Sequence, residues 1–305
     1  MKNVVFFKPG FTHSDYVIWH TPRSCPDVLA GTGFISGGFV LIDRPYVEKA
    51  ADSGSRKVTL LYGDPLRYMT RSILAGMFLT IVVFVYWSLL HNLHDISLGK
   101  VIASAFFGVG LTIIVFSNAE LFTSNNMYLA VSTKEGKTSL AQTVALWTAC
   151  YIGNLIGALI VAGLLCGTNA VADLPLDHAL YSGAAHKVHQ SAWAIFCKGV
   201  LANWVVCLAV RLALRAKEDV AKILILILVV FIFLYLGFEH SIANMGTFSI
   251  SLLGNGQISL GEALFNLVFS TAGNIVGGAC FVGLIFAYLN PAEAPVSASP
   301  HDRHE

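Results

Sequence analysis

The sequence predicts an all-α integral membrane protein built from two related halves. Of the 305 residues, 55% are hydrophobic and only 12% are charged, and the mean hydropathy is +0.68. A soluble domain would carry about 25% charged residues. Six apolar runs follow one another along the chain, each long enough for a helix that crosses a bilayer core with roughly 20 residues. The last three runs repeat motifs of the first three.

The apolar runs define the predicted membrane spans, at residues 69–90, 101–131, 140–166, 191–214, 223–253 and 262–289. The second and fifth runs are longer than one straight span needs. Each is interrupted by polar residues, SNAE at 117–120 and FEH at 238–240, and neither contains proline. We therefore predict that both are helices broken inside the membrane, where Gly, Ser, Asn and carboxylate groups satisfy the freed backbone.

Two segments flank the predicted channel domain of residues 69–289. Residues 1–45 form an N-terminal extension to which the sequence assigns no role. The first 20 residues lack the continuous apolar region and the small-residue cleavage site of a signal peptide, so we expect no cleavage there. The tail, residues 290–305 (NPAEAPVSASPHDRHE), is predicted to be disordered.

Lysine and arginine residues are concentrated on one side of the predicted spans. The segment before the first span and the loops after the second and fourth carry Arg56, Lys57, Arg67, Arg71, Lys134, Lys137, Arg211, Arg215, Lys217 and Lys222. The remaining loops carry only Lys100 and Lys187. The excess of positive charge predicts that the first group, and with it both termini, is cytoplasmic.

The two halves of the chain share a repeated motif. YIGNLIGALIVAGLL at 151–165 aligns with TAGNIVGGACFVGLI at 271–285, at a shift of 120 residues. At nearly the same shift Glu120 aligns with Glu239, and Asn126-Met127 with Asn244-Met245. Each copy crosses the membrane an odd number of times, which gives an inverted 3+3 repeat. Breaks at matching places in such a repeat indicate a translocation site near the midplane.

Small residues recur at four-residue spacing in both copies of the motif. Gly153 with Gly157, and Gly273 with Gly277, form GxxxG pairs. Such pairs usually allow two helices to pack closely. We interpret them as packing positions, within one chain or between chains.

A histidine and two glutamates stand inside the apolar runs. A lone histidine such as His240 is usually a satisfied core residue, but the repeat and the matching break favour a pore position. Glu120 and Glu239 resemble catalytic carboxylates. However, adjacent residues on a helix, such as Glu239 and His240, do not face each other. We predict that both close the broken helices by hydrogen bonds, and we predict no catalytic residue.

Metal and redox chemistry find little support in the sequence. His186 and His189 have a spacing that suits a metal, but no third ligand is near in the sequence. The six cysteines form no CxxC pair, and we interpret them as small apolar residues. The sequence therefore predicts neither a metal site nor a cofactor.

Four motifs together resemble the formate/nitrite transporter family of bacterial anion channels. They are AELFTSNNM (119–127), HKVH (186–189), LANWVVCLAV (201–210) and GFEHSIANM (237–245), and the resemblance extends from about residue 46 to 289. It implies an aquaporin-like protomer of six transmembrane helices with helices two and five broken, assembled as a homopentamer in the inner membrane. It also implies that residues 46–68 form an amphipathic interfacial segment.

The resemblance assigns pore roles to particular positions. His240 matches the central histidine, Thr123 the threonine that faces it, and Lys187 and Asn203 the residues that shape the field around the site. The apolar constrictions match Phe107, Leu111, Leu121, Phe122, Val206 and Phe233.

These residues predict transport of a small monovalent anion together with a proton. Moving a bare charge through an apolar slit costs several kcal/mol, and binding a proton removes most of that cost. We expect Lys187 to attract the anion and the substrate to pass the slit as the neutral acid. His240 either gives up its own proton or orients one from the vestibule. SNNM after Thr123 and the intact Phe and Leu constrictions resemble formate-type members of the family, so the resemblance implies formate, with nitrite, hydrosulfide, acetate and lactate as alternatives.

Three other classes fit the sequence less well. A haem subunit needs paired histidines, and His240 is the only histidine well inside a span. A sensor or scaffold that does not transport would not need the intact pore residues. A channel for neutral solutes usually has paired NPA turns, which this sequence lacks. A net charge of +1 with no basic tract gives no indication of nucleic-acid binding.

Overall fold

The computed structural model of the protein describes residues 43–291. All but the last three residues of the N-terminal extension, and all but the first two of the C-terminal tail, therefore lie outside the described residues. The expectations about these two segments stay predictions.

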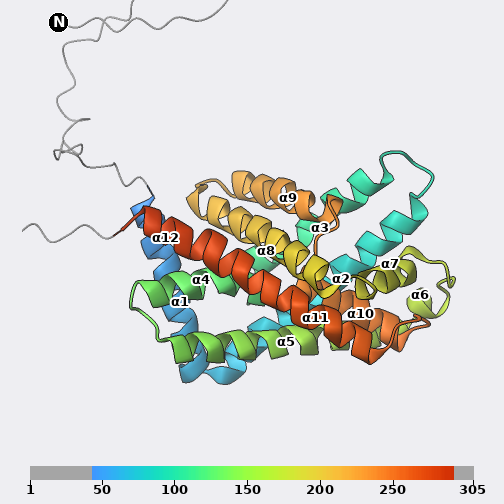
Figure 1. Ribbon diagram of the computed structural model, residues 1–305, viewed down its shortest axis with the longest axis horizontal. Helices are drawn as coiled ribbons and strands as arrows, with labels where there is room; N and C mark the ends of the chain where they lie inside the picture. Colours follow the sequence, from blue (N-terminus) through green and yellow to red (C-terminus); the bar gives the residue numbers. More distant parts are fainter. Residues whose placement is uncertain (1–42, 292–305) are drawn as a thin grey trace, which may run out of the picture. The chain divides into compact units, whose positions relative to one another are not determined.

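The described part of the chain is helical and contains no strand (Figure 1). Its first half comprises α1 (Arg44–Gly63), α2 (Pro65–Asn92), α3 (Gly99–Phe116), α4 (Phe122–Lys134) and α5 (Leu140–Cys166). Two short helices follow, α6 (Asn169–Ala172) and α7 (Ala179–Val188). Its second half comprises α8 (Ala192–Arg215), α9 (Asp219–Tyr235), α10 (Ser241–Leu253), α11 (Leu260–Ile275), the π-helical segment η1 (Val276–Leu284) and α12 (Ile285–Leu289).

Five of the helical stretches within residues 43–291 are long and apolar enough to cross a membrane. They are α2, α3, α5, α8 and the continuous stretch from α11 to α12. The two long apolar runs are both interrupted, the second between α3 and α4 and the fifth between α9 and α10. The sixth crossing, composed of α9 and α10, stays a prediction.

The first helix ends earlier than the predicted interfacial segment of residues 46–68. Gly63 closes α1, and the Asp64 side chain accepts a hydrogen bond from the Arg67 backbone N–H, which caps the start of α2. Pro65 suits the first turn of α2 because its missing N–H would have no helical partner there. Residues 65–68 therefore belong to α2, while α1 packs one face against α4.

Small residues bring two pairs of helices into close contact. A Cβ atom at Gly157 of α5 would overlap the backbone oxygen of Ile73 on α2, and one at Gly277 would overlap that of Val200 on α8. Figure 1 shows α8 running beside α11. The GxxxG pairs are therefore packing positions within one chain, which confirms one of the two interpretations.

The short helix α7 was not predicted from the sequence, and it carries Lys187. The His178 side chain caps its first turn by accepting a hydrogen bond from the Leu180 N–H at 3.2 Å. Gly183 lies so close to the Trp87 ring that any Cβ atom there would overlap it. This contact sets α7 against α2 and fixes the position of Lys187.

Candidate functional site

The two interruptions have the same backbone design. Asn118 and Gly237 have positive φ values of 53° and 68°, and they turn the chain after α3 and α9. Glycine adopts this conformation freely, and asparagine is among the few other residues that tolerate it. The backbone is then extended at Leu121 and His240, the residues just before α4 and α10. Each interruption thus ends at the N-terminus of a short helix.

One buried asparagine ties each interruption to its neighbouring helices. Asn274 accepts a hydrogen bond from the Ser241 N–H at 2.8 Å and donates to the backbone oxygens of Gly199 and Glu239. Asn154 makes the equivalent bonds in the other half, with the Phe122 N–H and the backbone oxygens of Ser72 and Glu120. These are the asparagines aligned by the 120-residue repeat, so the structure explains why the repeat includes them.

The two glutamates accept hydrogen bonds from matching partners. The Glu239 carboxylate lies 3.0 Å from the Lys187 ammonium group and 2.6 Å from the Asn244 amide, and Glu120 lies 2.5 Å from Lys57 and 3.1 Å from Asn125. Both carboxylates are almost fully buried. Each therefore connects an interruption to a lysine on another helix.

The alignment of Asn126 with Asn244 is wrong. Asn125, not Asn126, binds Glu120 in the way that Asn244 binds Glu239. Both asparagines follow their glutamate by five residues, so the shift of 119 that relates the glutamates also relates the asparagines. The repeated dipeptide Asn-Met concealed this register.

His240 and Thr123 face each other across the two halves of the chain. The Nε2 atom of His240 lies 3.0 Å from the Thr123 hydroxyl, and its Nδ1 atom accepts a hydrogen bond from the Ala243 N–H at 3.1 Å. A backbone N–H can only donate, so Nδ1 carries no proton in this arrangement and Nε2–H donates to Thr123. The hydroxyl hydrogen of Thr123 has no acceptor among residues 43–291. Thr123 is fully buried and lines neither of the two cavities described below.

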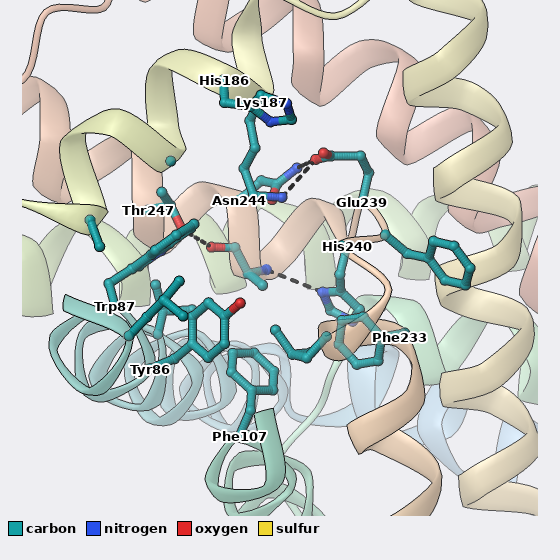
Figure 2. Close-up of a pocket in the computed structure, with 18 of the residues that line it drawn as sticks. Tyr86, Trp87, Phe107, His186, Lys187, Phe233, Glu239, His240, Asn244 and Thr247 are labelled. Carbon is teal, nitrogen blue, oxygen red and sulfur yellow. Dashed lines mark hydrogen bonds and ion pairs between the residues drawn. The ribbon is translucent and has the colours of Figure 1, made fainter. Parts of the chain in front are cut away.

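One cavity lies beside His240. It has a volume of about 500 Å³, and Phe107, Phe233, Glu239 and His240 contribute to its wall (Figure 2). Lys100, Lys187 and Lys198 also line it, against one carboxylate from Glu239. We call it the His240 cavity. Because its charged groups are mainly cationic, it favours an anion over a cation.

A second cavity lies beside Glu120 and has a volume of about 490 Å³. We call it the Lys57 cavity. Its charged lining residues are Arg56, Lys57, Arg71 and Glu120, again three cations and one carboxylate. The two cavities therefore share one charge pattern, each next to one of the two interruptions.

The predicted constriction residues divide into three groups. Phe107 and Phe233 line the His240 cavity, and Leu121 lines the Lys57 cavity. Leu111, Phe122 and Val206 line neither cavity and belong to the buried apolar cluster. Asn203 is also buried, and its amide donates to the backbone oxygens of Thr123 and Asn274. It thus joins the start of α4 to α11.

Sequence reasoning missed the cationic side chains of the Lys57 cavity as site residues. In the sequence, Arg56, Lys57 and Arg71 indicate only the orientation of the spans. The repeat supplies a signal once Lys187 is known to bind Glu239, because the matching Glu120 should then have an equivalent partner. His186 lines the His240 cavity, whereas His189 lies 3.2 Å from Glu262.

Comparison with known proteins decides the family. The model of the formate/nitrite transporter family matches residues 44–288. The chain belongs to this family. It is 35% identical over 255 residues to the nitrite transporter NirC of Escherichia coli K12, covering 82% of this chain and 94% of that protein.

Solved structures agree with this assignment. An FNT family ion channel superimposes with a TM-score of 0.77 at 33% identity, covering 81% of this chain and 99% of that one. A pentameric formate channel with formate bound gives a TM-score of 0.63 at 28% identity, covering 73% and 96%. This member of the formate/nitrite transporter family is thus a multi-pass membrane protein of the anion channel and transporter class.

Proposed function

We propose that this protein conducts small monovalent anions, formate and nitrite first among them, as a proton-coupled channel of the inner membrane. The observation that carries the proposal is the pair of cationic cavities, one beside His240 and one beside Glu120, together with the contact between His240 and Thr123 that joins the two interruptions. The sequence motifs favour formate, and NirC, at 35% identity, is named for nitrite. Hydrosulfide, acetate and lactate are the alternatives. A homopentamer with both termini in the cytoplasm is part of the proposal.

Attraction and dehydration act at different places along the pathway. Lys187 holds its ammonium group at the cavity wall, while the Glu239 carboxylate is 1% exposed and is bound by several donors. An anion in the cavity therefore meets the ammonium group before the carboxylate. Beyond the cavity the pathway is apolar, and a charge loses several kcal/mol of hydration there unless it is neutralised. The substrate passes this layer as the neutral acid.

His240 orients the substrate and keeps its own proton. Its Nδ1 atom caps α10, so protonating that atom would break the hydrogen bond from Ala243. Its Nε2–H donates to the Thr123 hydroxyl. We expect the hydrogen of that hydroxyl to bind an anion that reaches this contact. The proton that neutralises the anion comes from the water of the cavity. Of the two roles left open by the sequence, we propose the orienting one.

Transport in proteoliposomes tests the proposed function. Formate or nitrite entry should acidify the lumen and should not respond to a membrane potential set by valinomycin and potassium. A bare anion that crosses 100 mV gains or loses about 2.3 kcal/mol, so its distribution would change about fiftyfold. Flux that follows the potential without acidification would contradict passage as the neutral acid. A panel of the five anions identifies the substrate, and no flux for any of them would contradict the function itself.

Replacement of His240 tests its role. Without Nε2–H the Thr123 hydroxyl is no longer oriented, so the anion is not held while it gains a proton. Transport should then depend on substrate molecules that are already protonated in the bulk solution. Formate flux in His240→Phe should then fall about tenfold per pH unit between pH 6 and 8, more steeply than in the unmodified protein. His240→Asn keeps an N-cap side chain but is too short to reach Thr123, so it should show the same steep profile with normal folding. Unchanged pH profiles in both variants would remove the role of His240.

A further inference from the structure

Tyr86 on α2 presents an unpaired hydroxyl group to the His240 cavity. Its ring lies edge-on to the rings of Phe107 and Trp87, with distances of 5.9 Å and 5.0 Å between the ring centroids. The residue is only 8% exposed. In Figure 2 its hydroxyl points into the space between Trp87, Phe107 and His240. No hydrogen-bond partner for this hydroxyl occurs among residues 43–291. The ring is buried but the residue lines the cavity, so the hydroxyl is accessible from the cavity and can donate a hydrogen bond to a solute there.

The other hydroxyl groups of the cavity already have acceptors. Thr247 donates to the backbone oxygen of Ala243 at 3.3 Å and accepts from the Trp87 indole N–H at 3.0 Å. Ser182 lies within 3.5 Å of two backbone oxygens on its own helix. Among the described residues that line this cavity, Tyr86 therefore offers the one hydroxyl hydrogen that is not committed.

We propose that Tyr86 is a specificity-determining residue that donates a hydrogen bond to oxyanions with two acceptor oxygens, carboxylates and nitrite. The inference rests on the proposed function and adds a substrate preference to it. Lys187 attracts any anion, because a point charge does not distinguish shapes. Tyr86 then selects among the anions in the cavity. Its ring packs against Phe107, whose ring centroid lies 5.8 Å from that of Phe233, so the tyrosine lies next to the two predicted constriction residues that line the cavity.

The preference follows from the strength of the acceptor. Carboxylate and nitrite oxygens are strong acceptors, and a hydrogen bond to a charged oxygen is about twice as strong as a neutral one. Sulfur accepts hydrogen bonds only weakly. An oxyanion that is bound through one oxygen by Lys187 has its second oxygen free for Tyr86, whereas hydrosulfide has a single weak acceptor. The tyrosine hydroxyl therefore favours oxyanions over hydrosulfide.

Tyr86→Phe tests this directly, because it removes the hydroxyl and keeps the ring that packs on Phe107. Formate and nitrite flux into proteoliposomes should each fall about fivefold, from the loss of one hydrogen bond to a charged oxygen, and hydrosulfide flux should stay within about twofold. Tyr181→Phe is the matched control. Its hydroxyl bonds to the Asn255 N–H at 3.3 Å and does not line the cavity, so all three fluxes should be unchanged.

The outcomes separate this inference from the proposed function. If the unmodified protein transports formate or nitrite and Tyr86→Phe does so equally well, the tyrosine does not select and the function stands. An equal fall for all three anions would show an effect of packing on Phe107 and would also overturn the inference. No transport by the unmodified protein would contradict the proposed function instead.

Discussion

Gly157→Val should strongly destabilise the protein and lower its yield from membranes. The new side chain would have to occupy the position of the Ile73 backbone oxygen on α2. A backbone cannot rotate away as a side chain does, so α5 and α2 would have to separate along their contact. Overpacking usually costs about 1–3 kcal/mol, and we expect a loss at or above the upper end of this range. Thermal unfolding of the purified protein in detergent measures it.

Gly163→Val on the same helix is the control for this prediction. A Cβ atom at Gly163 meets nothing within 4 Å, so the substitution should change the unfolding temperature little. Both variants add the same β-branched side chain to α5, so the difference between them isolates the contact with α2. Similar losses in the two variants, or none in Gly157→Val, would contradict close packing of this helix pair.

The organisation of the chain was predictable because the bilayer imposes length and hydrophobicity on each span. The run at 140–166 coincides with α5, and the other runs differ from the helices by a few residues at their ends. The interruptions were predictable because the second and fifth apolar runs are longer than one span needs and each contains a group of polar residues. The short helix α7 was not, since its position depends on the contact of Gly183 with Trp87, which is tertiary.

The candidate site was predictable only in part. Motifs led to His240, Thr123 and Glu239, and the structure brings the first two into contact and pairs the third with Lys187. The Lys57 cavity was not predicted, because its cations come from α1 and α2 and meet Glu120 only after folding. Tyr86 carried no local signal at all. A tyrosine in an apolar helix usually packs in the core, and only its unpaired hydroxyl distinguishes it.

The repeat also shows where symmetry ends. Asn154 and Asn274, Glu120 and Glu239, and the two cationic cavities have counterparts in both halves, so they belong to the framework that supports the two helix N-termini. His240 does not, since Leu121 occupies the corresponding place before α4. The residue that departs from the symmetry is therefore the one to which we assign the orienting of the substrate while it gains a proton from the cavity water.

Asn274→Leu should destabilise the protein as much as any single change at the interruptions. Leucine has a similar volume but leaves the Ser241 N–H and the Glu239 backbone oxygen without their partner, while the Gly199 oxygen loses one of its two hydrogen bonds because it lies inside α8. Each unsatisfied buried group costs about 1–3 kcal/mol, so we expect a loss of about 3 kcal/mol or more. The start of α10, and with it His240, would no longer be fixed, so transport should fail together with stability.

Two further variants make this prediction specific. Asn154→Leu breaks the equivalent three bonds beside Phe122 and should cost a similar amount, because the geometry is the same. Asn255→Leu is the control, since that side chain is exposed and makes no hydrogen bond among the described residues. Thermal unfolding and formate uptake should both be near normal in this control. If Asn274→Leu unfolded at the temperature of the control, the asparagine would not support the broken helix, and the placement of His240 would need another cause.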